Sequence, residues 1–155
     1  MSDTPQDFIA TDTDRKGSKV DFYFTAGNTL TPELSSFILR GWADLIENGH
    51  GNANYMPVCS NKRIIYCRID GEIAGAIMWE WKDGNKTAFI EFTLIEKKFR
   101  GRGIYFLLHK YYDIRIKNGG AEASKSQLHI NNETIINAAK KDGYEIEFIK
   151  MIKRI

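Results

Sequence analysis

The stretch EFTLIEKKFRGRGIYFLLHKYYDIRIKN, residues 91–118, decides the fold of this chain. Its first part alternates polar and apolar side chains and is rich in β-branched and aromatic residues, which predicts a strand over residues 86–96. Its last part has apolar residues at helical spacing, which predicts a helix. The expected apolar face of that helix consists of Ile104, Leu107, Leu108, Tyr111 and Ile114.

The turn between them, KKFRGRG at residues 97–103, combines two glycines with four cations. Glycine lets the backbone approach a ligand closely, and the start of a helix offers unpaired N–H groups and the positive end of its dipole. These features favour a phosphate site, with Lys97, Lys98, Arg100 and Arg102 adding a field that attracts a polyanion. The alternatives are a solvated surface turn or an arginine–glycine contact to nucleic acid. The turn lacks the P-loop pattern and the third glycine of a dinucleotide fingerprint.

Composition narrows the class of protein. A chain of 155 residues fits one domain, and its 43% hydrophobic content is enough to fill a core. The net charge of +2 is too small to indicate a nucleic-acid partner. Cys59 and Cys67 form neither a ligand cluster nor a disulfide framework, and two thiols in a cytoplasmic protein are the simpler interpretation. Three widely spaced histidines make a metal site improbable, and His109 is expected to cover the surface of its helix.

Neither a secretory signal nor an apolar run of membrane-spanning length is expected from the sequence. Residues 1–18 are polar and predict an N-terminal arm, either mobile or packed as a short tail, and residues 19–155 predict a single domain. Within that domain we expect a strand at 19–26, a helix capped by Thr31, strands at 63–69, 72–81 and 86–96, the helix after the turn, a strand at 125–130, a short helix after Asn131–Asn132, and a last strand at 144–155.

The segment RGRGIY, Arg100 to Tyr105, resembles the acetyl-CoA signature of the GNAT N-acetyltransferase superfamily, Arg/Gln-x-x-Gly-x-Gly/Ala. Arg100 and Gly103 match this signature, whereas Tyr105 stands where the family usually has Gly or Ala. The order of expected elements is similar to the family's from about residue 19 to the end. The resemblance implies the GNAT fold, of α/β (α+β) class, with a mixed, mostly antiparallel sheet and helices on both faces.

The resemblance also implies acetyl-CoA as cosubstrate and no metal. It places the pyrophosphate on the turn and pairs pantetheine with the backbone at the end of the preceding strand. Asn132 falls on an Asn that contacts the coenzyme in many relatives, and a helix cap is its alternative role. The implied cofactor-binding residues are Thr93, Leu94, Ile95, Arg100, Gly101, Arg102, Gly103, Ile104, Tyr105 and Asn132.

Catalysis requires a base, because an amine with a pKa of about 10 is almost fully protonated at neutral pH. Glu91 is the first candidate, since it interrupts an apolar strand; a solvated strand acid is its alternative role. Relatives carry the base two residues earlier, where this chain has Phe89, or on the following strand, where it has Gln127. Glu80 and His129 are weaker candidates.

The family's general acid is a Tyr in the last helix, and Ala139 occupies that position here. The resemblance therefore leaves the proton source open among the tyrosines near the site. These are Tyr105, Tyr111, Tyr112 and Tyr144.

The resemblance implies an N-acetyltransferase in which a primary amine attacks the thioester carbonyl of acetyl-CoA directly, within a ternary complex. The backbone of the strand would polarise that carbonyl. We expect the amine to enter beside residues 50–55; a polyamine, a protein N-terminus and a lysine side chain all fit. Ala139 and Tyr105 motivate the alternative of a catalytically inactive coenzyme A-binding or regulatory domain. A nucleic-acid binder is disfavoured by the absence of an aromatic-basic stacking pattern, and no membrane partner is expected. The last strand is an edge that offers a homodimer contact.

Overall fold

The computed structural model describes residues 7–50 and 60–155 as one mixed sheet with helices on both faces. Its strands run in the order β1 to β6, neighbours in sequence being neighbours in space. The first five pair antiparallel, and β6 runs parallel to β5. The strands are β1 (Asp7–Thr13), β2 (Lys19–Ala26), β3 (Arg63–Ile69), β4 (Glu72–Lys82), β5 (Thr87–Ile95) and β6 (Ala123–Ser126).

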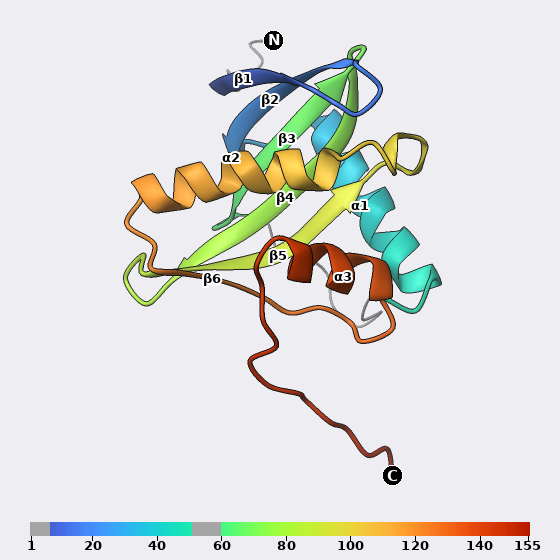
Figure 1. Ribbon diagram of the computed structural model, residues 1–155, viewed down its shortest axis with the longest axis vertical. Coiled ribbons are helices and arrows are strands. Elements are labelled where there is room, and N and C mark those ends of the chain that lie inside the picture. Colours follow the sequence, from blue (N-terminus) through green and yellow to red (C-terminus); the bar gives the residue numbers. More distant parts are fainter. Residues whose placement is uncertain (1–6, 51–59) are drawn as a thin grey trace.

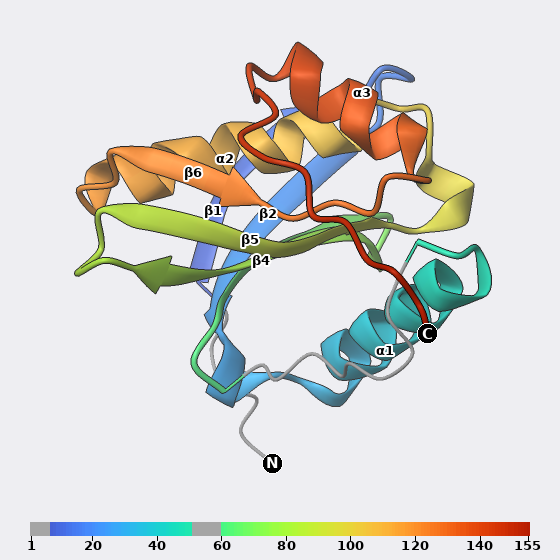
Figure 2. The same cartoon turned by 90° about the horizontal axis from the view of Figure 1, so that it is seen from below.

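Two helical layers enclose the sheet (Figures 1 and 2). The helix α1 (Pro32–Glu47) covers one face, and α2 (Ile104–Asn118) and α3 (Glu133–Lys141) lie over the other. Each face has its own buried apolar cluster: Leu34, Phe37 and Phe92 belong to the α1 side, and Ile90, Leu108 and Tyr112 to the α2 side. This arrangement confirms the predicted fold class.

Local sequence signals account for the element boundaries. The Thr31 hydroxyl accepts a hydrogen bond from the Leu34 amide and caps α1, whose first residue is Pro32. Asp70 and Gly71 both adopt positive φ, 50° and 79°, as the two-residue turn between β3 and β4 requires.

Several expectations about individual elements were wrong. Residues 7–13, expected to lie in an N-terminal arm, form the strand β1, because they pair with β2. The strand predicted at 125–130 is shorter and begins earlier, at Ala123. Ile114 is 49% exposed, because the buried stripe of α2 follows a four-residue spacing through Leu108, Tyr112 and Ile116.

The C-terminal segment 144–155 does not form the predicted strand. A strand requires a neighbouring backbone, and within the described residues none pairs with this segment. Figure 1 shows it leaving the body of the molecule. Its apolar side chains Ile146, Phe148, Ile149, Met151 and Ile152 are all at least 67% exposed.

The β1–β2 hairpin is fastened to the turn before α2 through Asp14. The Asp14 carboxylate is completely buried, accepts hydrogen bonds from the amides of Lys16 and Ser18, and lies 2.7 Å from Nε of Arg102. Burial alone would raise the pKa of Asp14, but the Ser18 amide and the Arg102 guanidinium outweigh it and hold the pKa below its usual 3.8.

We expect Asp14→Asn to lower the free energy of unfolding by about 2–3 kcal/mol at neutral pH, because it leaves the Arg102 guanidinium without its charge partner. The pKa of Asp14 is lower in the folded state, so its stabilisation is fully present above pH 3.8 and is lost as the pH falls through the folded value. Urea unfolding at several pH values measures both effects. Asp21→Asn, at a half-exposed strand position, is the control. An equal loss in both variants at neutral pH would contradict this role.

Candidate active site

The glycine turn, residues 97–103, links β5 to α2 by a short 3-10 helix, Lys97–Phe99, followed by two left-handed glycines. Gly101 has φ 76° and Gly103 has φ 81°, conformations that favour glycine. Gly103 is the N-cap of α2 and has no side chain to bond the first amides of the helix. Those amides have no intrahelical partner, so the turn presents donors suited to an anion.

The two arginines of the turn have different surroundings. Arg100 donates from Nε to the carbonyl of Ile95 at 3.1 Å and lies 3.1 Å from Asp44 of α1, while its side chain stays half exposed. Arg102 instead turns toward the β1–β2 hairpin, where it contacts Asp14 and donates to the Ser18 hydroxyl at 2.8 Å. Arg102 therefore offers a ligand its backbone amide rather than its guanidinium.

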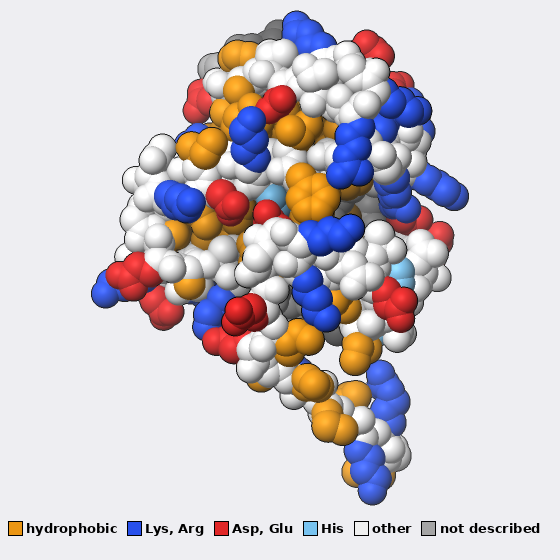
Figure 3. Space-filling view, viewed as in Figure 1, with side chains coloured by type: hydrophobic (Ala, Val, Ile, Leu, Met, Phe, Trp, Pro, Cys, Tyr) orange, Lys and Arg blue, Asp and Glu red, His pale blue; other side chains and the backbone are white. Residues whose placement is uncertain are grey.

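Arg15, in the β1–β2 turn, is a further cation at this site, which the sequence did not single out. Its amide donates to the carbonyl of Arg102 at 3.0 Å. A Cβ atom on Gly103 would lie 3.1 Å from the Arg15 Nε, so the side chain rests against the glycine. Lysine and arginine side chains gather over this side of the molecule (Figure 3). Because Arg15 is 85 residues before Arg100, only the fold reveals this contact.

Next to the glycine turn, β5 separates from β6. The parallel pairing covers only Thr87–Ile90 against Ala123–Ser126 and ends where β5 has a bulge. At this bulge Met78 pairs with Phe92 and Trp79 with Ile90, so the register shifts by one residue at Glu91. Beyond this point residues 92–95 pair with β4 but, within residues 7–50 and 60–155, with no strand on the β6 side. We call this region the splay. It contains the three residues predicted to pair with pantetheine, Thr93, Leu94 and Ile95.

Glu91 lies on the α1 side of the bulge in a cluster with Lys62 and Glu80. The Lys62 side chain is 8% exposed, and its Nζ lies 2.6 Å from Glu80 and 3.5 Å from Glu91. Hydrogen bonds from Lys62 and then Lys82 lower the pKa of Glu80, whereas desolvation raises the pKa of Glu91. Glu80 thus remains the ionised partner of the lysines, and Glu91 is the carboxylate whose pKa moves toward neutrality, as a general base requires. Sequence reasoning missed Lys62, a polar residue at the start of a strand.

On the other face, His109 is buried rather than covering the surface of α2 as predicted. Its Nε2 lies 3.1 Å from the Thr93 hydroxyl, and its Nδ1 lies 3.2 Å from the Asp142 carboxylate at the end of α3. Burial lowers the pKa of His109 to about 4, so the ring is neutral at pH 7. The Tyr105 ring stacks on this imidazole at 4.1 Å between centroids, which turns it toward His109.

The remaining predicted residues have structural partners. The Asn132 side chain caps α3 by accepting from the Ile135 amide at 3.4 Å. The hydroxyls of Tyr112 and Tyr144 each lie 2.6 Å from the Ser124 hydroxyl, and Tyr111 donates to Asp12. Gln127 and His129 lie exposed beyond the end of β6.

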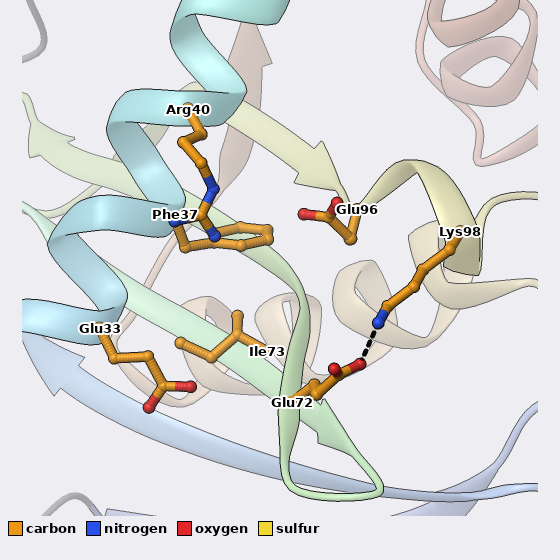
Figure 4. Close-up of a pocket in the computed structure, with 7 residues that line it drawn as sticks. All are labelled: Glu33, Phe37, Arg40, Glu72, Ile73, Glu96 and Lys98. Atoms are coloured by element: carbon orange, nitrogen blue, oxygen red, sulfur yellow. Dashed lines mark ion pairs between the residues drawn. The ribbon is translucent and has the colours of Figure 1, made fainter.

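Two cavities open on the surface of the described residues. One, of about 280 Å³, lies between α1 and the ends of β4 and β5 (Figure 4). Its lining includes Phe37, Arg40 and Glu96 and an ion pair between Glu72 and Lys98. The other, of about 500 Å³, lies by Trp81 and Arg115 at the far end of α2. Neither includes Glu91 or the glycines of the turn.

Part of the predicted substrate entry, residues 51–55, lies outside the described residues, as does Cys59. Within residues 7–50 and 60–155, no group of three His, Cys, Asp or Glu side chains is placed to hold a metal ion. In the same ranges, no helix combines the length and apolar character needed to cross a membrane.

Comparison with known proteins places this geometry among acetyltransferases. No family model matches the chain. It is 24% identical over 136 residues to an uncharacterized N-acetyltransferase, YdgE, of Bacillus subtilis (strain 168), covering 84% of this chain and 81% of that protein.

Solved structures share the fold at lower identity. The aminoglycoside N-acetyltransferase AAC(6')-Iy in complex with CoA superposes with a TM-score of 0.65 at 16% identity, over 87% of this chain and 98% of that one. A ribosomal-protein-alanine N-acetyltransferase from Brucella melitensis biovar Abortus 2308 gives 0.64 at 11% identity, over 88% and 99%. The chain therefore has the fold that these N-acetyltransferases share.

Proposed function

We propose that this chain is an acyl-CoA N-acyltransferase that transfers the acetyl group of acetyl-CoA to a primary amine by direct attack in a ternary complex. The observation that carries the proposal is the contiguity of two features, the glycine turn at the start of α2 and the splay beside it. Arg100 joins them, since it belongs to the turn and bonds the last carbonyl of β5. An anion at the turn and an extended chain in the splay would therefore be neighbours.

The residues present fit acetyl-CoA as cosubstrate. The amides of residues 101–105 would hold its pyrophosphate, with Arg100 and Arg15 supplying positive charge. The open backbone of Thr93 to Ile95 would pair with its pantetheine arm, in the manner of an added strand. Asn132 would contribute beside its role as a cap. When bound, the thioester supplies an activated acyl group, and backbone amides near Leu94 and Ile95 would stabilise charge on its oxygen.

Glu91 is the proposed general base. Its position in the bulge puts its carboxylate on the α1 side of the sheet, beside the point where the splay begins. Removal of a proton from the substrate ammonium generates the nucleophile. Lys62 lies closer to Glu80 than to Glu91, so it compensates the charge of Glu80 first and leaves the Glu91 carboxylate able to accept a proton.

The substrate is proposed only as a class. The similar proteins include enzymes named for aminoglycosides and for ribosomal-protein alanine, so small-molecule and protein amines both suit the proposal. The alternative is a coenzyme A-binding domain without turnover, motivated by Ala139. Tyr105 was the second reason for this alternative. Its ring stacks on His109, which weakens that reason.

We expect Gly101→Ala to weaken acetyl-CoA binding at least tenfold in a calorimetric titration, about 1.4 kcal/mol. A side chain is strained at φ 76°, and relaxation of the turn would misdirect its amides. The matched control is Gly120→Ala, since Gly120 also has positive φ, 95°, and open space around it, but lies after the other end of α2. Equal binding by the two variants, or no binding by the natural sequence, would contradict pyrophosphate binding at the glycine turn.

We expect Glu91→Gln to lower kcat by about 10²–10⁴-fold while acetyl-CoA still binds. The natural protein should lose activity as the pH falls through the Glu91 pKa, which desolvation raises above 4.5, because only the carboxylate accepts a proton. An amine-library screen with thiol detection, followed by pH profiles of both proteins, measures this. Full activity of the variant would exclude Glu91 as the base, and binding without turnover for every amine would favour the inactive alternative.

The homodimer is proposed from the exposed segment 144–155. Its first half carries Glu145 and Glu147 and its second half Lys150, Lys153 and Arg154. Antiparallel pairing of two copies by a two-fold axis would set the acidic half of one against the basic half of the other. It would also cover apolar side chains that are otherwise in water, such as Phe148 and Met151.

We expect sedimentation equilibrium to give a dimer for the natural sequence. Phe148→Glu combined with Met151→Glu should give a monomer with an unchanged melting temperature, because these side chains contribute little to the core. Ile114→Glu, which changes an exposed apolar residue on α2, is the control and should leave the dimer intact. A monomeric natural protein at high micromolar concentration would exclude this contact.

A further inference from the structure

His109 joins three elements that surround the splay. It projects from α2, contacts Thr93 of β5 through Nε2 at 3.1 Å, and approaches Asp142 at the end of α3 through Nδ1 at 3.2 Å. The histidine is 2% exposed and the Asp142 side chain 20%. A hydroxyl, an imidazole and a carboxylate thus follow one another from the splay into the interior.

The contact between His109 and Asp142 involves two buried polar atoms. Nδ1 of His109 and Oδ2 of Asp142 are both buried and make no hydrogen bond among the described residues, although they face each other at 3.2 Å. Buried polar atoms are rarely left without partners, so the two atoms point to a shared proton. The other titratable groups around the pair are Tyr105, Tyr112 and Tyr144, whose rings contact the imidazole, and Asp113, whose charge acts on Asp142.

Burial fixes how many protons the pair holds. Desolvation, and then the charge of Asp113, raises the pKa of Asp142, while desolvation lowers that of His109. Both shifts favour the state in which His109 and Asp142 together carry no net charge and hold two protons. In that state one proton lies between Asp142 and Nδ1, and the other is on Nε2 and points at the Thr93 oxygen. The Thr93 hydroxyl hydrogen is then free to be donated into the splay.

We propose that Thr93 is the catalytic residue that protonates the departing coenzyme A thiolate, with His109 and Asp142 as positioning residues that orient its hydroxyl and restore its proton. The proposal rests on the proposed function, since it needs the thioester beside Thr93. It supplies the acid that the resemblance located at the position of Ala139. It also accounts for the position of the buried His109 between Thr93 and Asp142, which packing alone does not explain.

The proton transfers balance as follows. As the carbon–sulfur bond breaks, its electron pair goes to sulfur, and sulfur takes the hydroxyl proton of Thr93. The Thr93 oxygen takes the proton from Nε2 of His109, and Nδ1 takes the proton from Asp142. Asp142 is left as a carboxylate. The proton that the amine nitrogen loses on becoming an amide replaces it through solvent, so no outside oxidant or reductant is needed.

The test is the pKa of the thiol of bound coenzyme A, followed by the ultraviolet absorbance of the thiolate during a pH titration of the saturated complex. A hydroxyl that donates to the sulfur stabilises the thiolate, so the thiol should titrate about one pH unit below free coenzyme A. Thr93→Val removes the hydroxyl at nearly constant shape and should abolish this shift. Thr93→Ser keeps the hydroxyl and should restore it.

Two further variants separate the relay from general effects on the strand. Thr87→Val makes the same change on β5 where the strand still pairs with β6, and should leave the shift intact. Asp142→Asn has an amide that donates to Nδ1, so it keeps the Nε2 proton directed at Thr93 and should preserve the shift, whereas His109→Phe should lose it.

The outcomes are distinct. Calorimetry on the same samples reports coenzyme A binding, and failure of the natural protein to bind would refute the proposed function itself. Normal binding with equal thiol pKa values in the natural protein and Thr93→Val would overturn the role of Thr93. A shift that persists in His109→Phe would overturn the role of the histidine.

Discussion

One extra residue in β5 determines the chemistry that this sheet can support. At the Glu91 bulge the strand takes two steps on the same face, so Glu91 and Phe92 both lie on the α1 side and Thr93 turns to the α2 side. In a regular strand, residues 91 and 93 would share a face. The bulge therefore separates a carboxylate and a hydroxyl, two residues apart, onto opposite sides of one strand, and the pairing with β6 ends at the same place.

The glycine turn depends on a second constraint, its attachment to the β1–β2 hairpin. Two left-handed glycines alone would leave the turn free to adopt many conformations. The Arg102 guanidinium bonds to Asp14 and Ser18, and the Arg102 carbonyl accepts from the Arg15 amide. These contacts fix the backbone of the turn through the guanidinium and the carbonyl of Arg102 rather than through its amide. A site for an anion works best when its donors are fixed before the ligand arrives, because less entropy is lost on binding.

The sequence predicted the elements better than it predicted their faces. Burial along β5 alternates regularly from Ala88 to Leu94, so the pattern contains no sign of the bulge. The reason is that helices cover both faces: Ile90 is buried against α2, and Phe92, at the same parity, is buried on the α1 side. The bulge moves the buried side chains of β5 from the cluster on the α2 side to the cluster on the α1 side, so the hydrophobic periodicity of the sequence stays the same. The C-terminal segment is the opposite case. Tyr144, Ile146 and Phe148 alternate with polar residues, but no described strand pairs with them.

The residues missed at the site share a physical cause. Lys62, Arg15 and His109 acquire their surroundings from segments far away in sequence, and no local pattern marks them. His109 was expected to cover the surface of its helix, and no local pattern marks it as buried. In the structure α3 closes over the same helix and places Asp142 against the imidazole, so the buried stripe is wider than one sheet contact would give.

The bulge and the contact of α3 with α2 give a physical reason for the arrangement of the proposed base and acid. A base that takes a proton from an amine and an acid that gives one to a thiolate interfere if they exchange protons directly. The proposed groups, Glu91 and Thr93, lie on opposite faces of β5, with different charged neighbours: Lys62 and Glu80 on one side, His109 and Asp142 on the other. The strand backbone between them then acts as a barrier to proton exchange as well as a support for the ligand. A single inserted residue is enough to produce that separation.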